Sequence, residues 1–144
     1  MIAVDTNILV AAHRRDADRH GRAAAAIRGL AEDSTPWAIP WSCLHEFLGI
    51  VTHPRIFRTP STVAAAVSQV ESWLASPSLT LLGERFDHWS HLRLAIAEGD
   101  ARGARIHDAR IAATCIAHGV SSLWTADRDF GRFPQLRTHN PLVG

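Results

Sequence analysis

The first nine residues constrain the fold more than any other stretch of the chain. Ile2 to Val4 form a short apolar run, which predicts a buried strand. Asp5 follows at once, and the next apolar positions have helical spacing, at Ile8, Leu9, Ala11 and Ala12. A carboxylate at the end of a buried first strand lies where open α/β sheets bind their ligands. The alternative is that Asp5 only caps the helix, by accepting hydrogen bonds from its free N–H groups.

The rest of the chain alternates between short apolar runs and longer segments with helical periodicity. Further strands are expected over 37–40, 79–82, 120–125 and 136–138, and helices over 21–31, 42–51, 61–74, 86–98 and 105–118. This alternation predicts an α/β fold, a three-layer α/β/α sandwich with a short-stranded, mostly parallel central sheet. The chain has 144 residues without a linker or repeat, so a single domain over residues 1–144 is expected.

Composition indicates an ordinary globular protein and not a strongly basic one. The net charge is +1 and 47% of the residues are hydrophobic, as in an ordinary globular protein without an overall basic field. All 15 basic residues are arginine; five of them, Arg14, Arg15, Arg19, Arg22 and Arg28, cluster after the first strand, and Arg55 and Arg58 flank a later loop. Arginine suits phosphate recognition, although an arginine-rich chain can also reflect the nucleotide composition of its genome.

No segment predicts export or membrane insertion. No apolar run approaches the roughly 18 residues of a membrane span, and no basic segment precedes an apolar one at the N-terminus. Cys43 and Cys115 lie in apolar helical patterns, as expected of core cysteines in a reduced protein. His88 and His91 lack further ligands at zinc-site spacing and are expected to be solvated. We therefore expect a cytoplasmic protein without a membrane partner.

The aromatic residues leave two interpretations open. Trp73 and Trp89 match the apolar stripes of their helices, which predicts that both pack in the core. Trp37 and Trp41 flank the proposed sheet edge, where an indole ring either packs or stacks on a nucleic-acid base.

Three further carboxylates, like Asp5, lie at the end of a predicted strand or near the start of a predicted helix. Glu46 lies in the first turns of the helix after the second strand, and Asp108 lies in the first turn of a later helix. Asp127 directly follows the fourth strand. Carboxyl ends of parallel strands and amino ends of the following helices share one edge of the sheet. We therefore expect all four carboxylates to converge on one pocket.

Four carboxylates in one pocket repel one another and raise each other's pKa values. A hard divalent cation relieves this repulsion, and Mg²⁺, for which Mn²⁺ can substitute, prefers oxygen ligands and retained waters. Such a site suits metal-assisted cleavage of a phosphodiester. The expected supporting residues are Thr6, Asn7, Thr125 and Asp129. Because of the repulsion, Asp5→Asn is expected to stabilise the metal-free protein.

Four motifs together resemble those of the PIN-domain ribonucleases. They are Val4-Asp5-Thr6-Asn7-Ile8-Leu9, Leu44-His45-Glu46-Phe47, His107-Asp108-Ala109-Arg110-Ile111-Ala112-Ala113 and Thr125-Ala126-Asp127-Arg128-Asp129-Phe130. They occur in the order and at the spacing of the family, over nearly the whole chain. Within the family, the chain looks like a VapC toxin of a type II toxin–antitoxin pair.

The resemblance implies a Mg²⁺-dependent endoribonuclease that cleaves structured RNA such as tRNA or rRNA and inhibits translation. It also implies homodimerisation and neutralisation by a cognate antitoxin protein. The metal ligands of the family carry over to Asp5, Glu46, Asp108 and Asp127. In the last motif Asp127 is the expected ligand and Asp129 the loop-stabilising carboxylate, although which one faces the metal stays open. His107 stands where many relatives have Asn or another polar residue, and we expect it to be solvated rather than bound to substrate.

Two other functions and one binding surface are also considered. A small-molecule phosphate hydrolase acting through an aspartyl-phosphate needs a second Asp two residues after the nucleophile, where this chain has Asn7, and a suitably placed Lys, which it lacks. A non-catalytic RNA- or protein-binding module is disfavoured because all four carboxylates are present. Phe47, Leu48 and Phe57 are candidates for lining an antitoxin groove.

Overall fold

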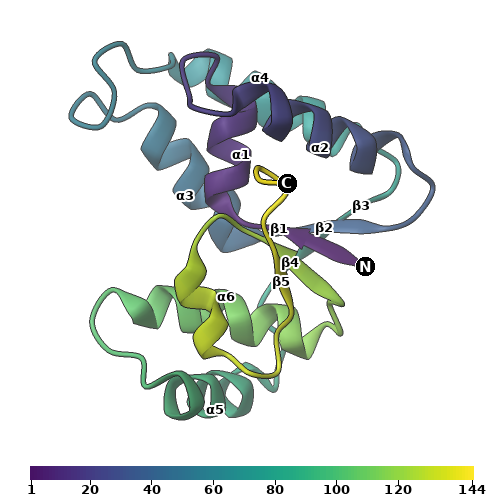
Figure 1. The fold of residues 1–144 in the computed structure, drawn as a ribbon, viewed down its shortest axis with the longest axis vertical. Coiled ribbons are helices and arrows are strands. Elements are labelled where there is room, and N and C mark those ends of the chain that lie inside the picture. Colours follow the sequence, from purple (N-terminus) through teal and green to yellow (C-terminus); the bar gives the residue numbers. More distant parts are fainter.

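A five-stranded sheet forms the centre of the computed structural model, which describes residues 1–144 (Figure 1). Its strands are β1 (Ile2–Val4), β2 (Trp37–Pro40), β3 (Leu79–Leu82), β4 (Ser122–Trp124) and β5 (Thr138–His139). They lie in the order β3-β2-β1-β4-β5, and every neighbouring pair is parallel. The predicted parallel sheet with short strands is therefore confirmed.

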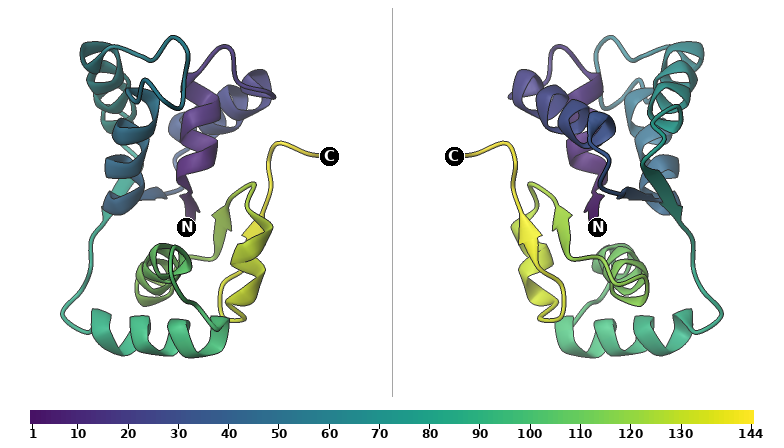
Figure 2. Two further views of the ribbon diagram at one scale, coloured as in Figure 1. Left: turned by 90° about the vertical axis from the view of Figure 1, so that its left-hand side faces the viewer. Right: turned by 90° about the vertical axis from the view of Figure 1, so that its right-hand side faces the viewer.

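Helices cover both faces of this sheet, as predicted for a three-layer sandwich. One layer contains α1 (Thr6–His13), α2 (His20–Glu32), α3 (Trp41–Val51) and α4 (Val63–Leu74). The other contains α5 (His88–Gly99) and α6 (Arg105–Ala117), and the views from both sides agree on this division (Figures 1 and 2). A short 3₁₀ helix, η1 (Arg128–Arg132), connects β4 to β5.

The order of the strands reverses direction beside β1. The chain runs outward from β1 through β2 to β3, and then returns to place β4 on the other side of β1. Val4 is therefore paired with Trp124, although 120 residues separate them. The carboxyl ends of β1 and β4 form the topological switch point of the sheet, which is the place where ligands bind in open α/β folds.

The core lies on both sides of the central strands, because helices cover both faces. Ala3 and Val4 of β1 and all four residues of β2 are buried. Trp73 is 6% exposed, as predicted, and Trp37 is fully buried. The prediction for Trp89 is wrong, since this side chain is 65% exposed.

Trp89 is exposed because it lies in the first turn of α5, one turn before the buried part of the same helical stripe begins. Leu92 and Ile96 of that stripe pack against the core, and Ala95 is buried. Helical periodicity identifies the stripe but not the turn at which the neighbouring helix begins to cover it.

The ends of the elements follow local hydrogen bonding. Thr62 begins α4 by accepting a bond from the backbone N–H of Ala65, at 3.1 Å. Gly119 follows α6 with φ of 68°, a left-handed conformation that favours glycine at a helix end. The last strand begins later than predicted, because Leu136 closes a turn by donating its backbone N–H to the carbonyl of Phe133. None of the helices has the length and apolar character needed to cross a bilayer.

A close packing contact at the end of α5 provides a test of the fold. A Cβ atom added at Gly99 would lie 2.6 Å from a ring carbon of Phe133, whereas one added at Gly29 would meet nothing within 4 Å. We expect Gly99→Ala to lower the free energy of unfolding by about 2 kcal/mol through overpacking. The matched variant Gly29→Ala is expected to raise it by about 0.5 kcal/mol, because alanine favours the helical backbone. Urea unfolding followed by circular dichroism measures both, and equal effects of the two changes would contradict the packing described here.

Candidate active site

Asp5 is the buried centre of the site at the switch point. It is only 4% exposed and lies between the end of β1 and the start of α1. Its Oδ1 accepts the backbone N–H of Thr6 at 2.8 Å. Its Oδ2 accepts the hydroxyl of Thr125 at 2.7 Å and the side-chain amide of Asn7 at 3.1 Å. Asp5 is therefore both a helix cap and a fixed carboxylate of the site, so the two interpretations of this residue are compatible.

The same hydrogen bonds join the loops that follow β1 and β4. Asn7 also donates from Nδ2 to the hydroxyl of Thr125 and accepts the backbone N–H of Ala126 on its Oδ1, at 3.1 and 3.0 Å. The Thr125 hydroxyl in turn accepts the backbone N–H of Asp127 at 3.0 Å. Asn7 and Thr125 thus hold Asp5 and Asp127 in fixed relative positions, which is the supporting arrangement expected of them.

One pocket brings the predicted carboxylates together. Its volume is about 290 Å³, and its lining includes Asp5, Glu46, Asp108 and Asp127. These side chains come from four separate parts of the chain: the start of α1, the middle of α3, the first turn of α6 and the loop after β4. Thr6 and Asn7 line the same pocket. The predicted convergence at one edge of the sheet is therefore present in the structure.

Burial and mutual repulsion both act on these carboxylates. Burial raises the pKa of Asp5, hydrogen bonds from Thr125 and Thr6 oppose part of this rise, and Glu46 adds to it. Desolvation is the main cause that raises the pKa of Glu46, and the negative charge of Asp108 raises it further. Glu46 as a whole residue is nevertheless exposed. Desolvation likewise raises the pKa of Asp108, and the charges of Asp127 and Asp5 raise it further. The site is therefore an electrostatically strained cluster of like charges.

The donor set fits a hard divalent cation held partly through water. The hydroxyl oxygen of Thr6 is buried beside the carboxylates and has no hydrogen-bond partner in the protein. No three acidic, histidine or cysteine side chains lie close enough to hold one ion by themselves. The four carboxylates line one pocket but do not form a ready-made ligand cluster, so a Mg²⁺ ion, which is commonly bound through one or two carboxylates and keeps several waters, would contact the others only through water.

The two acidic residues of the last motif have different surroundings. Asp127 lines the pocket, and its Oδ1 accepts the backbone N–H of Asp129 at 2.9 Å, which caps η1. Asp129 is absent from the pocket lining and forms an ion pair with Arg105, at 2.7 Å. Asp127 is therefore placed as a candidate ligand, and Asp129 stabilises the loop.

Two neighbours of the carboxylates were not predicted as part of the site. Arg105, from the start of α6, is held at the site by its ion pair with Asp129 and experiences the charges of Asp108 and Asp127. Cys43 was predicted only as a core residue, but its thiol donates to Asp5 Oδ1 at 3.7 Å. Burial raises the pKa of this thiol well above its usual value, and the charge of Asp5 adds to the rise, so Cys43 remains a neutral thiol.

Comparison with known proteins identifies the family. The family model of the PIN domain matches residues 2–136. A VapC ribonuclease of Mycobacterium bovis is 38% identical over 146 residues, which cover 100% of this chain and 97% of that protein. The chain belongs to the VapC ribonucleases of the PIN-domain family.

Two solved structures of this kind share the fold of this VapC ribonuclease. VapBC2 from Rickettsia felis, bound to a DNA fragment from its promoter, superimposes with a TM-score of 0.69 at 21% identity and covers 97% of this chain and 98% of that one. VapC20 of Mycobacterium tuberculosis, described as a sarcin–ricin loop cleaving toxin, superimposes with a TM-score of 0.66 at 21% identity, with 91% and 93% of the two chains covered.

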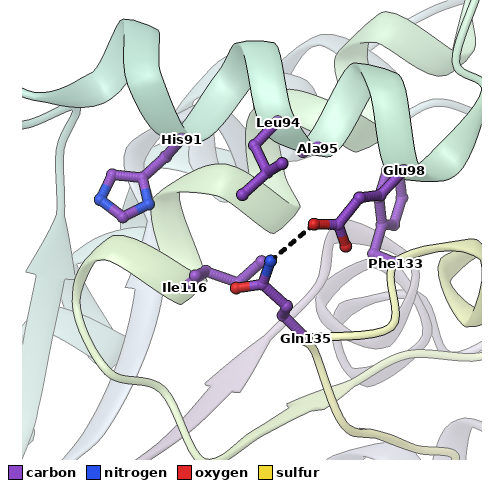
Figure 3. Close-up of a pocket in the computed structure, with 7 residues that line it drawn as sticks. All are labelled: His91, Leu94, Ala95, Glu98, Ile116, Phe133 and Gln135. Carbon is purple, nitrogen blue, oxygen red and sulfur yellow. Dashed lines mark hydrogen bonds between the residues drawn. The ribbon is translucent and has the colours of Figure 1, made fainter.

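A small cavity elsewhere in this VapC ribonuclease does not contain a cluster of carboxylates like that of the acidic pocket. It lies between α5, α6 and the segment after η1, has a volume of about 10 Å³, and is lined by His91, Leu94, Ala95, Glu98, Ile116, Phe133 and Gln135 (Figure 3). The amide of Gln135 donates to Glu98 at 2.8 Å, and His91 bonds to Asp87. Glu98 and Gln135 bond to each other within the lining, and His91 bonds to Asp87 outside it, so we interpret the cavity as a packing defect between elements.

The residues suggested for an antitoxin groove do not form one together. Phe47 is fully buried, where it contacts the ring of Trp73 at a centroid distance of 4.9 Å. Leu48 is partly buried against the core, and the Phe57 ring is covered by the guanidinium of Arg14 at 4.1 Å. The prediction is wrong for Phe47, because this side chain belongs to the core of the α1–α3–α4 layer.

The surroundings of Asp5 also change the expected effect of removing its charge. In Asp5→Asn, an amide group replacing Oδ2 would face the donating amide of Asn7, so the relief of repulsion would be offset by lost hydrogen bonds. Asp108 makes no hydrogen bond through its side chain and is the better position for the experiment. The side chain of Asp108 is repelled by the other carboxylates of the pocket, and it makes no hydrogen bond that stabilises the fold.

The raised pKa of Asp108 predicts a pH-dependent stability. A carboxyl whose pKa is raised in the folded protein favours folding below its usual value of 3.8 and loses that contribution as the pH rises. We expect Asp108→Asn to raise the free energy of unfolding of the metal-free protein at pH 7 by roughly 0.5 to 1 kcal/mol, a low value because solvent screens this partly exposed group. The difference is expected to vanish below the usual pKa.

Urea unfolding in chelator, from about one pH unit below the usual pKa of 3.8 to about pH 8, measures this effect. Asp18→Asn provides the control, because Asp18 is exposed, lies outside the pocket and makes no hydrogen bond through its side chain. An Asp108→Asn protein less stable than wild type at pH 7 would show that this carboxylate supports the fold instead of straining it.

Proposed function

We propose that this VapC ribonuclease is a Mg²⁺-dependent endoribonuclease toxin that cleaves structured RNA such as tRNA or rRNA and so inhibits translation. The observation that supports this proposal is the single pocket lined by four carboxylates at the switch point of the sheet. Its relative VapC20 is described as a toxin that cleaves the sarcin–ricin loop, which is an RNA target of this kind. A small-molecule phosphate hydrolase has no support from this family membership.

In the proposed mechanism, Asp5 and Asp108 hold the cation, and Glu46 and Asp127 complete its surroundings directly or through water. When bound, Mg²⁺ or Mn²⁺ polarises the scissile phosphate and lowers the pKa of the attacking water. The side chain of Asp5 is oriented by its bonds from Thr6 and Thr125, so no reorganisation is needed at that ligand.

Other groups of the chain contribute to binding of the RNA backbone. The free hydroxyl of Thr6 can hold a water beside the carboxylates. Arg105 supplies a fixed positive charge next to a pocket that is otherwise strongly negative, and Asp129 keeps it there. The amino end of α6, where Asp108 lies, adds the positive potential of a helix start.

The partners of the proposed toxin follow from its family. VapBC2 of Rickettsia felis was solved as a complex bound to promoter DNA. We infer that a cognate antitoxin protein neutralises this ribonuclease, that the chain functions as a homodimer, and that it acts in the cytoplasm, where its RNA substrates are found. A non-catalytic RNA-binding role is disfavoured, because binding alone does not require four mutually repelling carboxylates.

Metal removal and a single substitution test the proposal. We expect the purified protein to cleave total bacterial RNA in Mg²⁺. Cleavage is expected to stop when chelator removes the metal and to resume when Mn²⁺ is added. Asp108→Asn is expected to lower the cleavage rate at least about 100-fold, because it removes a charge that holds the cation. Sequencing of the new RNA ends measures cleavage and locates the cut site.

The control for this experiment is again Asp18→Asn, which should cleave at the wild-type rate. Unfolding curves of both variants distinguish loss of chemistry from loss of fold. Cleavage that persists in chelator, or undiminished cleavage by Asp108→Asn, would refute metal-dependent catalysis at this pocket.

A further inference from the structure

A second pocket adjoins the acidic one and has a different character. Its volume is about 310 Å³, and it is lined by Ser42 and His45 of α3, His107 and Arg110 of α6, and the shared residues Glu46 and Ile111. Ile111 is its only apolar residue. Because the two pockets share the wall formed by Glu46, a molecule bound in one lies directly beside the contents of the other.

The polar groups of this second pocket have few partners in the protein. Arg110 donates from Nε to the carboxylate of Glu84, while its two terminal nitrogens make no hydrogen bond. His45 and His107 are exposed, and their rings make no hydrogen bond either. The rings of several other histidines are bonded within the protein, namely His13, His20, His53, His91 and His118. The second pocket therefore concentrates hydrogen-bonding capacity that the fold itself does not use.

An exposed indole ring neighbours His45, one of the residues that line this pocket. Trp41 begins α3 and is 44% exposed. Its ring centroid lies 6.1 Å from that of His45, and the two planes are inclined by 34°. The loop after β3 also lies near the indole, since a Cβ atom added at Gly83 would be in van der Waals contact with Cδ1 of the ring, at 3.9 Å. The indole is thus supported by the fold while part of its surface stays accessible.

We propose that the second pocket binds a nucleotide of the substrate RNA adjacent to the scissile phosphate, with Arg110 on its phosphate and Trp41 stacked on its base. This inference depends on the proposed function. An arginine with free terminal nitrogens is suited to phosphate, and an exposed aromatic ring at a positively charged groove is a common platform for an unpaired base. Here Arg110 and His45 line one pocket, and Trp41 lies against His45. The ion pair with Glu84 acts as a positioning contact that orients the guanidinium.

An antitoxin peptide is the other occupant to consider, and the lining disfavours it. A peptide helix that docks in a groove buries an apolar face, and this pocket offers a single apolar side chain. A nucleotide needs hydrogen-bond donors, a positive charge and an aromatic face; the pocket supplies the first two, and Trp41 beside His45 supplies the third. The shared wall of Glu46 also places the pocket next to the carboxylates, where the neighbours of a cleaved phosphate must lie.

RNA binding by matched variants tests this proposal. The probe is a fluorescently labelled oligoadenylate 12-mer, with Ca²⁺ in place of Mg²⁺, and binding is followed by fluorescence anisotropy. We expect Trp41→Ala to weaken binding about tenfold through lost stacking, and Trp41→Phe to restore most of the loss. Trp89→Ala is the control, because Trp89 is exposed on α5 and does not line the pocket, and its change is expected to stay below about twofold.

A second pair of variants tests the phosphate contact. We expect Arg110→Gln to weaken binding about tenfold and to reduce the slope of log Kd against log salt concentration by about 0.7, the value for one phosphate of a single strand. Arg93→Gln, at an exposed arginine of α5, should leave both quantities unchanged. Equal effects of Trp41→Ala and Trp89→Ala, or of Arg110→Gln and Arg93→Gln, would overturn the assignment.

Two further outcomes separate this inference from the proposed function. If oligoglutamate 12-mers bind as tightly as the RNA and lose affinity equally in Trp41→Ala, Trp41 does not act by stacking on a base and the nucleotide assignment is refuted. If the wild-type protein cleaves no RNA but binds the 12-mer through Trp41 and Arg110, the pocket assignment stands and the nuclease proposal fails. Cleavage by a protein whose RNA affinity does not depend on Trp41 or Arg110 would refute only the pocket.

Discussion

The buried carboxylate of Asp5 is the interaction on which the rest of the site depends. Removing a carboxylate from water is costly unless hydrogen bonds replace its solvation. Here the backbone of Thr6, the hydroxyl of Thr125 and the amide of Asn7 provide that replacement. Because Thr125 follows β4, the solvation of Asp5 requires the two central strands to lie side by side. The same contacts therefore stabilise the switch point of the sheet and fix the geometry of the pocket.

The site also divides into two regions of opposite character on either side of Glu46. Toward Asp5 and Asp127, like charges accumulate and the folded protein tolerates them at a cost in stability, as expected where function conflicts with stability. Toward Arg110, the two terminal nitrogens of the guanidinium and the rings of His45 and His107 make no hydrogen bond, and one indole is exposed nearby. An RNA backbone would complement this division of charge if one phosphate met the acidic pocket through a metal ion and the next phosphate bound Arg110 directly.

Much of the fold and of the acidic pocket is predictable from the sequence, because both follow local rules. A short apolar run before Asp5, and carboxylates at later element ends, suffice to place four residues at one edge of a parallel sheet. The position of Trp89 was predicted wrongly because periodicity does not reveal where a neighbouring helix begins to cover a stripe. The contact of Arg110 with Glu84 joins α6 to a loop 26 residues earlier, so no spacing rule identifies it. The second pocket therefore emerges only from tertiary structure.

The central position of β1 has a consequence for synthesis of the protein. This strand comes from the first residues of the chain, yet its neighbour β4 comes from residues 122–124 and the hydroxyl that holds Asp5 comes directly afterwards. Chains emerge from the ribosome amino end first, so a nascent chain contains its key carboxylate long before it contains the partner that orients it. An unfinished chain therefore lacks an assembled pocket, and the carboxylates converge only after the segment that follows β4 has been made.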